Sequence, residues 1–112
     1  MNNHSVKIYI PATYNATIPM PSIIRRHFIN KVQSELVMIF GGTTRYNAVG
    51  AWYSEDKKRV ITEKQTIIIS TCNDEQYQEN ANKVIAIAEY LKKAMKQECI
   101  TIELDNVMQF IW

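Results

Sequence analysis

The sequence holds few of the residues that mark special classes of protein. Its 112 residues include three glycines, three prolines, two cysteines and two histidines. Two cysteines make no disulfide framework, so Cys72 and Cys99 are expected to be reduced thiols in a cytoplasmic protein. The histidines and cysteines lack zinc-site spacing, and we expect neither a metal nor a cofactor. The polar start Met1–Ser5 is unlike a signal peptide.

Charge and apolar runs exclude further classes. A formal net charge of +2 is too small to indicate a nucleic-acid or membrane partner. The longest apolar runs, such as Leu36–Phe40, are too short to cross a membrane. Composition is that of a globular protein, and the length suits one domain with one core over residues 1–112.

Alternating apolar and β-branched residues predict the strands. These are Val6–Ile10, Tyr46–Tyr53, Val60–Thr71, Ile100–Leu104 and a short last strand, Val107–Trp112. Gly50 interrupts the second strand, which indicates a bulge or the close approach of another backbone or a ligand. The charged segment Ser54–Arg59 is expected to connect the second and third strands as a hairpin. Pro11–Pro21 contains all three prolines and is expected to be an irregular loop.

Two amphipathic patterns predict helices. The first has apolar residues at spacings of three and four, with Ser22 as its N-cap, Phe40 as its last residue and Gly41 as its C-cap. The second begins after Asn73, another N-cap candidate, and carries a regular apolar stripe to Met95.

The order strand–helix–strand–strand–helix–strand predicts an α+β, ferredoxin-like split βαβ domain with two helices on one face of an antiparallel sheet. A 4-1-3-2 strand order would gather the connections at opposite ends of the sheet. One end would hold Gly41–Thr44, Thr71–Asp74, the Asp105-Asn106 turn and the N-terminus with His4. The other would hold the Pro11–Pro21 loop, the Ser54–Arg59 hairpin and the Gln97-Glu98 connection.

The candidate binding site lies in the glycine-rich stretch between the first helix and the second strand. Backbone N–H groups, hydroxyls, a guanidinium and aromatic faces can together hold a small anionic or nucleotide-like ligand. The alternatives are that the glycines only end a helix and that Trp52 fills the core. The predicted ligand-binding residues are Gly41, Gly42, Thr43, Thr44, Arg45, Tyr46 and Trp52.

Other residues give weaker indications of an enzyme site or of RNA binding. A small enzyme could use Cys72 as a nucleophile, His4 as a base or Glu63 as a carboxylate. A buried inert thiol is the simpler interpretation of Cys72. An RNA-recognition domain shares this strand order, but its third strand carries aromatic residues. Here that strand has none, and Tyr9 alone resembles a base-stacking residue, so nucleic-acid binding is not favoured.

The chain ends in an apolar, aromatic segment, Phe110–Trp112. An exposed apolar edge strand tends to pair with another chain, so the segment packs under its own helices or against another copy. We expect a homo-oligomer, a dimer or a higher symmetric assembly.

Three short motifs carry a resemblance. Phe-Gly-Gly-x-Thr at Phe40–Thr44, Gly-x-Trp at Gly50–Trp52 and Thr62-Glu63 together resemble small uncharacterised proteins of bacterial plasmids, phages and genomic islands. The likeness spans the middle half of the chain. It implies an accessory role in a mobile element, such as capturing a signalling nucleotide or inhibiting a host factor.

The absence of a recognisable catalytic set favours a non-enzymatic binding protein that oligomerises. One alternative is a small hydrolase or isomerase that uses Cys72, His4 or Glu63. Another is a protein–protein inhibitor that acts through an exposed edge strand or the Pro11–Pro21 loop.

Overall fold

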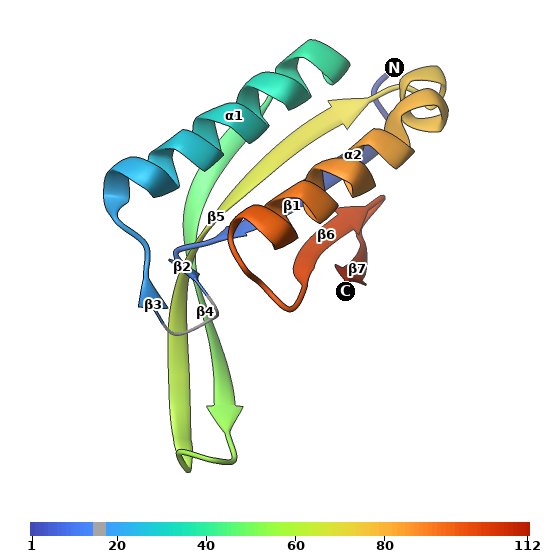
Figure 1. Cartoon of the computed structure of the whole chain (residues 1–112). Coiled ribbons are helices and arrows are strands. Elements are labelled where there is room, and N and C mark those ends of the chain that lie inside the picture. The colour runs from blue at the N-terminus through green and yellow to red at the C-terminus, as the bar shows by residue number, and fades with distance from the viewer. Residues whose placement is uncertain (15–17) are drawn as a thin grey trace.

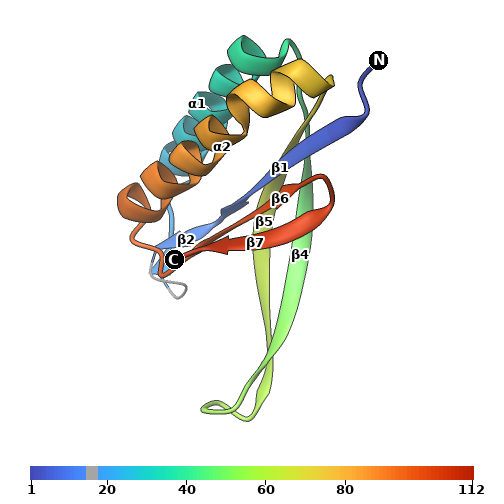
Figure 2. The ribbon, with the colours of Figure 1, turned by 90° about the vertical axis from the view of Figure 1, so that its right-hand side faces the viewer.

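The computed structural model describes residues 1–14 and 18–112. Its elements follow the order β1 (His4–Pro11), β2 (Thr13–Tyr14), β3 (Ile18–Pro19), α1 (Ser22–Phe40), β4 (Thr44–Ser54), β5 (Arg59–Cys72), α2 (Asp74–Ala94), β6 (Ile100–Leu104) and β7 (Val107–Ile111). Figure 1 shows both helices along one side of a twisted sheet, and Figure 2 shows the other side of that sheet left without helices. We call this uncovered side the open face.

The main sheet has the order β4-β5-β1-β6-β7, and every neighbouring pair is antiparallel. Ile8 of β1 lies opposite both Ile68 of β5 and Ile102 of β6. The four main strands therefore stand in the predicted 4-1-3-2 order, and β7 adds the expected last strand outside β6. The α+β, ferredoxin-like prediction is confirmed.

The core lies between the sheet and the two helices. Val6, Ile8 and Ile10 alternate along β1 with full burial, and they pack in one cluster with Leu36 of α1 and Leu91 of α2. Each such side chain contributes about 1.5–3 kcal/mol when fully buried. This core fixes which sides of β1, β5 and β6 face the helices, and so which residues form the open face.

The helix ends confirm two predicted caps and correct a third. Gly41 has a left-handed φ of 95° and donates its N–H to Val37, as a C-cap does. Asn73 forms a capping box with Gln76 at the start of α2. The Ser22 prediction is wrong by one residue. The N–H groups of Ile24 and Arg25 donate to the carbonyl of Pro21, which makes Pro21 the N-cap.

The segment between β1 and α1 differs from the predicted irregular loop. Thr13 pairs with Pro19 and Tyr14 pairs with Ile18, forming a small two-stranded sheet. Residues 15–17 lie outside the described residues. The N–H of Met20 donates to the carbonyl of Ala12 at 2.9 Å, which closes the segment before α1 begins.

β4 and β5 extend well beyond the rest of the sheet. Pro11, the last residue of β1, lies opposite Gln65, and residues 59–64 of β5 continue past it, paired with β4. We call residues 49–64 the hairpin arm, which projects from the body in Figures 1 and 2. Six residues of strand are about 20 Å long, so the hairpin tip does not join the Gln97-Glu98 connection as predicted.

The remaining predicted neighbours at that end do meet. The side-chain amide of Gln97 donates to the carbonyl of Thr13 at 2.6 Å. The connection after α2 is thereby tied to the segment after β1. Within the described part of the chain, no helix is long and apolar enough to cross a membrane.

Candidate functional site

β4 separates the residues predicted to form one site. Gly41 to Thr44 precede or begin the strand, whereas Trp52 lies eight residues farther along it. At about 3.3 Å per residue, Thr44 and Trp52 are about 26 Å apart. One small ligand on one copy of the chain therefore contacts one end of the predicted set or the other. Ligand binding by these residues stays a prediction.

The glycine end forms a shallow hollow of about 550 Å³, which we call the glycine hollow. Its shape depends on two hydrogen bonds, from Ser70 Oγ to the carbonyl of Gly42 at 2.9 Å and from Gln33 Nε2 to Thr43 Oγ1 at 2.9 Å. The end of α1 presents carbonyl groups here, the negative pole of its dipole. The hollow is lined by Asn2, Phe40, Gly41, Gly42, Thr43, Thr44, Ile69 and Thr71.

Arg45 and Tyr46 point to opposite sides of the sheet, as neighbours on a strand do. Arg45 Nη1 donates to Asn30 Oδ1 of α1 at 3.1 Å, so the guanidinium lies on the helix side. Tyr46 lies opposite Ile67, which in turn lies opposite Tyr9. The three side chains form one row across the open face.

Trp52 belongs to the hairpin arm and is 48% exposed, so it does not fill the core. Its indole N–H donates to Glu63 Oε1 at 3.2 Å. Glu63 lies opposite Gly50, and a Cβ added at Gly50 would approach Gln65 Nε2 to 2.9 Å. The glycine therefore gives room to the Gln65 side-chain amide, whereas the sequence predicts a bulge or the approach of another backbone or a ligand. Pairing between β4 and β5 stays in register through Gly50.

Glu63 and Gln65 also line a deeper hollow of about 560 Å³ at the end of the sheet near the α2–β6 connection. We call it the Tyr9–Trp112 hollow. It combines two aromatic side chains with amides and carboxylates, and Lys96 is its one lining cation in the described chain. Its lining residues are Tyr9, Pro11, Glu63, Gln65, Lys96, Gln97, Glu98, Cys99, Ile100, Thr101 and Trp112.

The phenol of Tyr9 is held in place at the edge of this hollow. Its O–H donates to Glu103 Oε2, and Lys7 Nζ lies 3.7 Å from Glu103 Oε1. The hydrogen bond to Glu103, together with burial, raises the pKa of Tyr9 to about 12. Tyr9 is therefore a neutral donor at physiological pH, with a fixed ring orientation.

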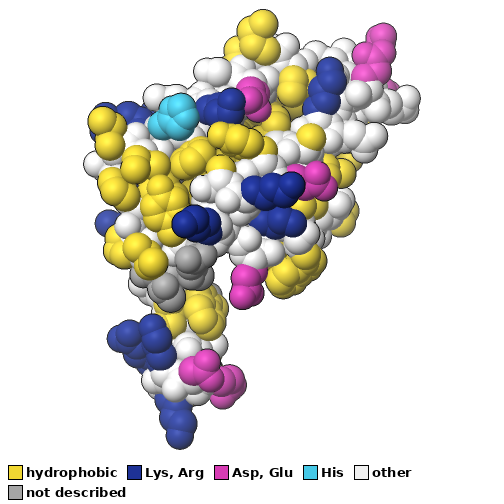
Figure 3. Space-filling model, viewed as in Figure 1, with side chains coloured by type: hydrophobic (Ala, Val, Ile, Leu, Met, Phe, Trp, Pro, Cys, Tyr) yellow, Lys and Arg dark blue, Asp and Glu magenta, His cyan; other side chains and the backbone are white. Residues whose placement is uncertain are grey.

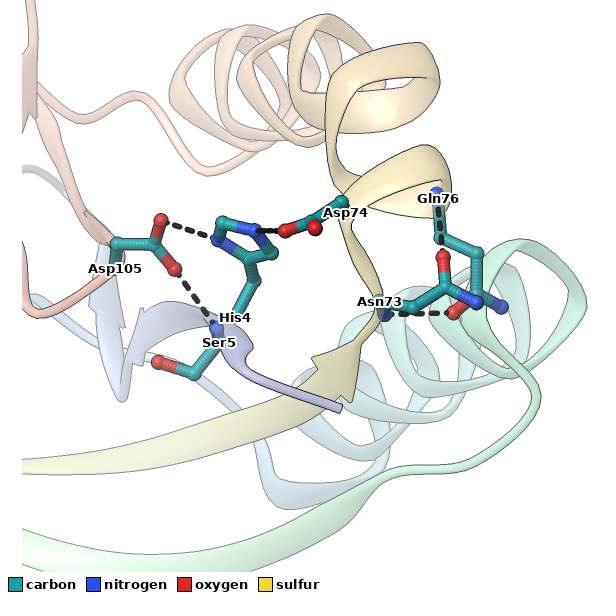
Figure 4. Close-up of polar contacts among 6 residues, drawn as sticks. All are labelled: His4, Ser5, Asn73, Asp74, Gln76 and Asp105. Atoms are coloured by element: carbon teal, nitrogen blue, oxygen red, sulfur yellow. Dashed lines mark hydrogen bonds and ion pairs between the residues drawn. The ribbon is translucent and has the colours of Figure 1, made fainter. Parts of the chain in front are cut away.

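The other end of the sheet holds the predicted His4 cluster, drawn in Figure 4. His4 Nδ1 lies 2.6 Å from Asp105 Oδ2, and His4 Nε2 contacts Asp74 Oδ1. These hydrogen bonds, with that to Asp105 the stronger cause, raise the pKa of His4. The bond from His4 lowers the pKa of each carboxyl. The imidazole also stacks on Tyr77 at 4.5 Å between ring centroids.

The two thiols carry no sign of activation. Cys72 is fully buried in the core cluster, and burial raises the pKa of its thiol. Burial likewise raises the pKa of Cys99, which lines the Tyr9–Trp112 hollow. A reactive cysteine needs a lowered pKa. Of the three groups considered for an enzyme, Cys72 is thus the least suited, while Glu63 borders a hollow.

Another groove, lined by residues of α1 and α2, lies on the helix side of the molecule. Exposed apolar side chains gather along α1 and α2 in Figure 3, whereas charged side chains occupy the hairpin tip. The groove measures about 450 Å³, and its apolar walls are Met38, Ile39, Ala86 and Ile87.

Sequence reasoning missed the residues that β1, β6 and the C-terminus bring to the Tyr9–Trp112 hollow. From the sequence, Tyr9 resembles only a base-stacking residue, and Trp112 is expected only in an interface or under the helices. The alternation of Tyr9 with buried Ile8 and Ile10 was the available signal, because it places Tyr9 on the face away from the core.

The fold defines the class of protein: a ferredoxin-like α+β domain with a long β4–β5 arm and an added edge strand. Among solved structures it is similar to a phage SAM lyase in complex with S-methyl-5′-thioadenosine. That likeness has a TM-score of 0.63 and 17% identity, and covers 96% of this chain and 88% of that one.

It is also similar to CutA1, described as a divalent ion tolerance protein, from Ehrlichia chaffeensis. The TM-score is 0.57 and the identity 17%, over 93% of this chain and 80% of that one. The likeness to CutA1 from Pyrococcus horikoshii OT3 has a TM-score of 0.52 and 12% identity, and covers 90% of this chain and 79% of that one. At these identities the likeness establishes the fold alone. No family model and no curated protein matches the sequence.

Proposed function

We propose that the protein is a small oligomeric binding protein whose ligand is an adenine nucleoside with a sulfur-containing 5′ substituent. The Tyr9–Trp112 hollow is the proposed site, and of the predicted set Trp52 touches it only through its hydrogen bond to the lining residue Glu63. The main support is that two aromatic side chains, an amide and a carboxylate line one hollow of about 560 Å³. This volume is within the usual range for a small-molecule site.

The chemistry of the lining residues suits such a nucleoside. Aromatic faces stack on a purine, and the Gln65 amide offers the donor and acceptor pair that matches the edge of adenine. Glu63 accepts hydrogen bonds from ribose hydroxyls. The carboxylates of Glu63 and Glu98 outnumber the one lining cation, Lys96, among the described residues. A neutral thioether or a positively charged sulfonium is therefore favoured over an anion at this hollow.

The likeness to a phage SAM lyase in complex with S-methyl-5′-thioadenosine supports this choice of ligand class, because it spans 96% of the chain. Together with the motifs at residues 40–44 and 50–52, it also supports an accessory role in a phage or another mobile element. Such a protein would act by capturing a nucleoside of the host cell.

Oligomerisation is part of the proposal. On β7, Phe110 and Met108 are 52% and 50% exposed, and Trp112 is 74% exposed. Ile111 packs against its own core. The aromatic members of the C-terminal segment are thus available to a second copy, while the aliphatic one is used in cis. A copy that pairs along β7 would also cover Trp112 at the edge of the Tyr9–Trp112 hollow.

The test is calorimetric titration of the purified chain with S-methyl-5′-thioadenosine and with S-adenosylmethionine. We expect saturable binding of one or both. Glu63→Gln or Gln65→Ala should weaken it by about tenfold, the loss of roughly 1.4 kcal/mol. Glu55→Gln, which removes a carboxylate at the hairpin tip, is the matched control and should change it by less than about twofold. Absence of binding to both nucleosides would overturn the proposal.

A second candidate is enzymatic cleavage of S-adenosylmethionine, in which the methionine carboxylate of the substrate attacks its own γ-carbon as the bond from that carbon to sulfur breaks. The products are then S-methyl-5′-thioadenosine and homoserine lactone, and Glu63 would hold the sulfonium substrate in place. It is favoured by the lyase described among the similar structures and by the place of Glu63 at the hollow. Chromatography of S-adenosylmethionine after incubation with the protein distinguishes capture from cleavage. Appearance of S-methyl-5′-thioadenosine that Glu63→Gln abolishes supports the enzyme, and binding with unchanged nucleoside recovered supports capture.

A further inference from the structure

Three arginines line one hollow on the helix side of the sheet, away from the Tyr9–Trp112 hollow. Arg25 and Arg26 are the fourth and fifth residues of α1, and Arg45 is the second residue of β4. The hollow measures about 260 Å³, and we call it the arginine hollow. Its remaining lining residues are Ser22, Ile29, Asn47 and Thr66.

The polar groups of the arginine hollow are partly fixed by neighbours. Arg45 Nη1 donates to Asn30 Oδ1 at 3.1 Å. The buried Thr66 donates its hydroxyl to Asn47 Oδ1 at 3.2 Å. Arg25 is half-buried, whereas Arg26 and Arg45 are exposed. The hollow therefore has a floor of ordered polar groups and a rim of guanidinium groups.

The positive charge continues into an adjoining hollow of about 380 Å³. This second hollow shares Arg25 and Asn47 with the first and adds Lys64. Among the described residues, no acidic side chain lines either hollow, and the ion pairs of the described chain include none of these four cations. The four like charges repel one another unless an anion lies among them.

The position of the arginines on α1 is itself unfavourable. The first turn of a helix carries the positive pole of its dipole, where acidic side chains stabilise and cations destabilise. α2 follows this rule with Asp74 and Glu75 in its first turn, whereas α1 has no acidic residue in its first turn and has Arg25 and Arg26 at its fourth and fifth positions. An anion held between α1 and β4 would offset the charge of these arginines near the positive end of the helix.

We propose that the arginine hollow binds a phosphate group. Guanidinium groups bind phosphate through paired N–H donors, and cations from two elements can contact a tetrahedral anion from more than one side. Ser22 offers a further hydroxyl donor. The adjoining hollow with Lys64 has room for a second phosphate. The arginine hollow shares no lining residue with the Tyr9–Trp112 hollow, although the adjoining hollow shares Gln65 with it.

The phosphate can belong to a free small molecule or to a nucleic-acid backbone. Inorganic pyrophosphate is the probe for the first source, and a short single-stranded oligothymidylate is the probe for the second. Both are titrated calorimetrically at low ionic strength, where screening is weak. We expect saturable binding of at least one probe.

The diagnostic variant is R25Q/R45Q, with K57Q/R59Q as a control that removes two cations at the hairpin tip. We expect R25Q/R45Q to weaken binding by at least about tenfold, with less than about twofold for the control. R26Q, which changes an exposed side chain, provides a second variant if the double variant does not fold, and should weaken binding by about threefold.

Binding of pyrophosphate with this pattern identifies a free phosphate ligand. Binding of the oligothymidylate alone, with the same pattern and a salt-dependent affinity, identifies a backbone phosphate. The proposal is overturned if neither probe binds, or if the control weakens binding as much as R25Q/R45Q does. Nucleoside binding at the Tyr9–Trp112 hollow should be the same in R25Q/R45Q as in the native chain, so the two proposals can fail separately.

Discussion

His4 Nδ1 lies 2.6 Å from Asp105 Oδ2, and this contact joins the first strand to the β6–β7 turn. Asp105 has a positive φ of 53° and accepts a second hydrogen bond, from the N–H of Ser5. The other ring nitrogen of His4 reaches Asp74 in the first turn of α2. When His4 is protonated, both nitrogens donate, and one side chain links three elements that are far apart in the sequence.

The His4 cluster predicts a window of pH in which it stabilises the fold. The pKa of folded His4 is raised above its ordinary value of 6.5, so its contribution is complete below that value and is lost as pH rises through the raised pKa. The pKa values of Asp74 and Asp105 are lowered from 3.8, so their contribution is lost as pH falls through the lowered values. The stabilising window therefore lies between about pH 4 and 6.5.

The prediction is checked by thermal unfolding of the native chain and of His4→Gln at pH values inside, below and above this window. The difference in unfolding temperature should be largest inside the window and should shrink on either side. His27→Gln changes an exposed histidine of α1 and is the control. A constant difference at every pH would contradict the assigned role of the His4 cluster.

Asn73→Ala should lower the free energy of unfolding by about 0.5–2 kcal/mol. The side chain of Asn73 accepts from the N–H of Gln76 at 2.8 Å, and Gln76 returns a bond to the N–H of Asn73. Denaturant unfolding measures the loss. Asn82→Ala, at an exposed position of the same helix, should lower stability by less. Equal effects of the two variants would count against the capping box.

Much of this fold could be predicted because its signals are local. Gly41 and Asn73 mark helix ends within one turn, and the alternation along β1 specifies its buried face. The extent of the hairpin arm could not be predicted, because an alternating strand reads the same whether or not β1 lies beside it. Pairing of Gln65 with Pro11 marks where the body ends, and that register is a tertiary property.

The candidate site was less predictable, because its members converge from distant parts of the chain. Glu63 is a candidate from the sequence alone, but Tyr9 and Trp112 join it only through strand order and the length of β7. Arg45 was grouped with Tyr46 by sequence, whereas the alternation of a strand puts them on opposite faces.

Gly50→Ala should leave stability within about 1 kcal/mol, because alanine costs less conformational entropy than glycine in a strand. Its Cβ would lie 2.9 Å from Gln65 Nε2, so the amide must move. We expect weaker nucleoside binding by titration, by about three- to tenfold. Ala51→Val, at the next position and on the other face, should leave affinity unchanged. Native affinity in Gly50→Ala would show that the Gln65 amide does not position the ligand.

Replacing Phe110 and Trp112 together by serine should reduce the assembly mass towards the 13.0 kDa of one chain. Both side chains are exposed aromatics at the C-terminal edge of the sheet, and burial in a partner would stabilise the contact by about 25 cal/mol per Å² of apolar surface. Light scattering after size exclusion measures the mass. Val107→Ser, also on β7 but closer to the turn, is the control. A native chain that remains monomeric at high concentration would contradict the expectation.

The hairpin arm divides the molecule into regions of unequal local stability. β5 is paired on both sides from Gln65 to Ile69, whereas in the described chain residues 59–64 pair with β4 alone. A two-stranded ribbon is marginally stable in water, so its amide hydrogens exchange with solvent by local fraying, while those of β1 await global unfolding. A second copy or a ligand that covers the arm slows exchange there first. Amide exchange at residues 49–64 is thus a label-free measure of how fully that surface is occupied.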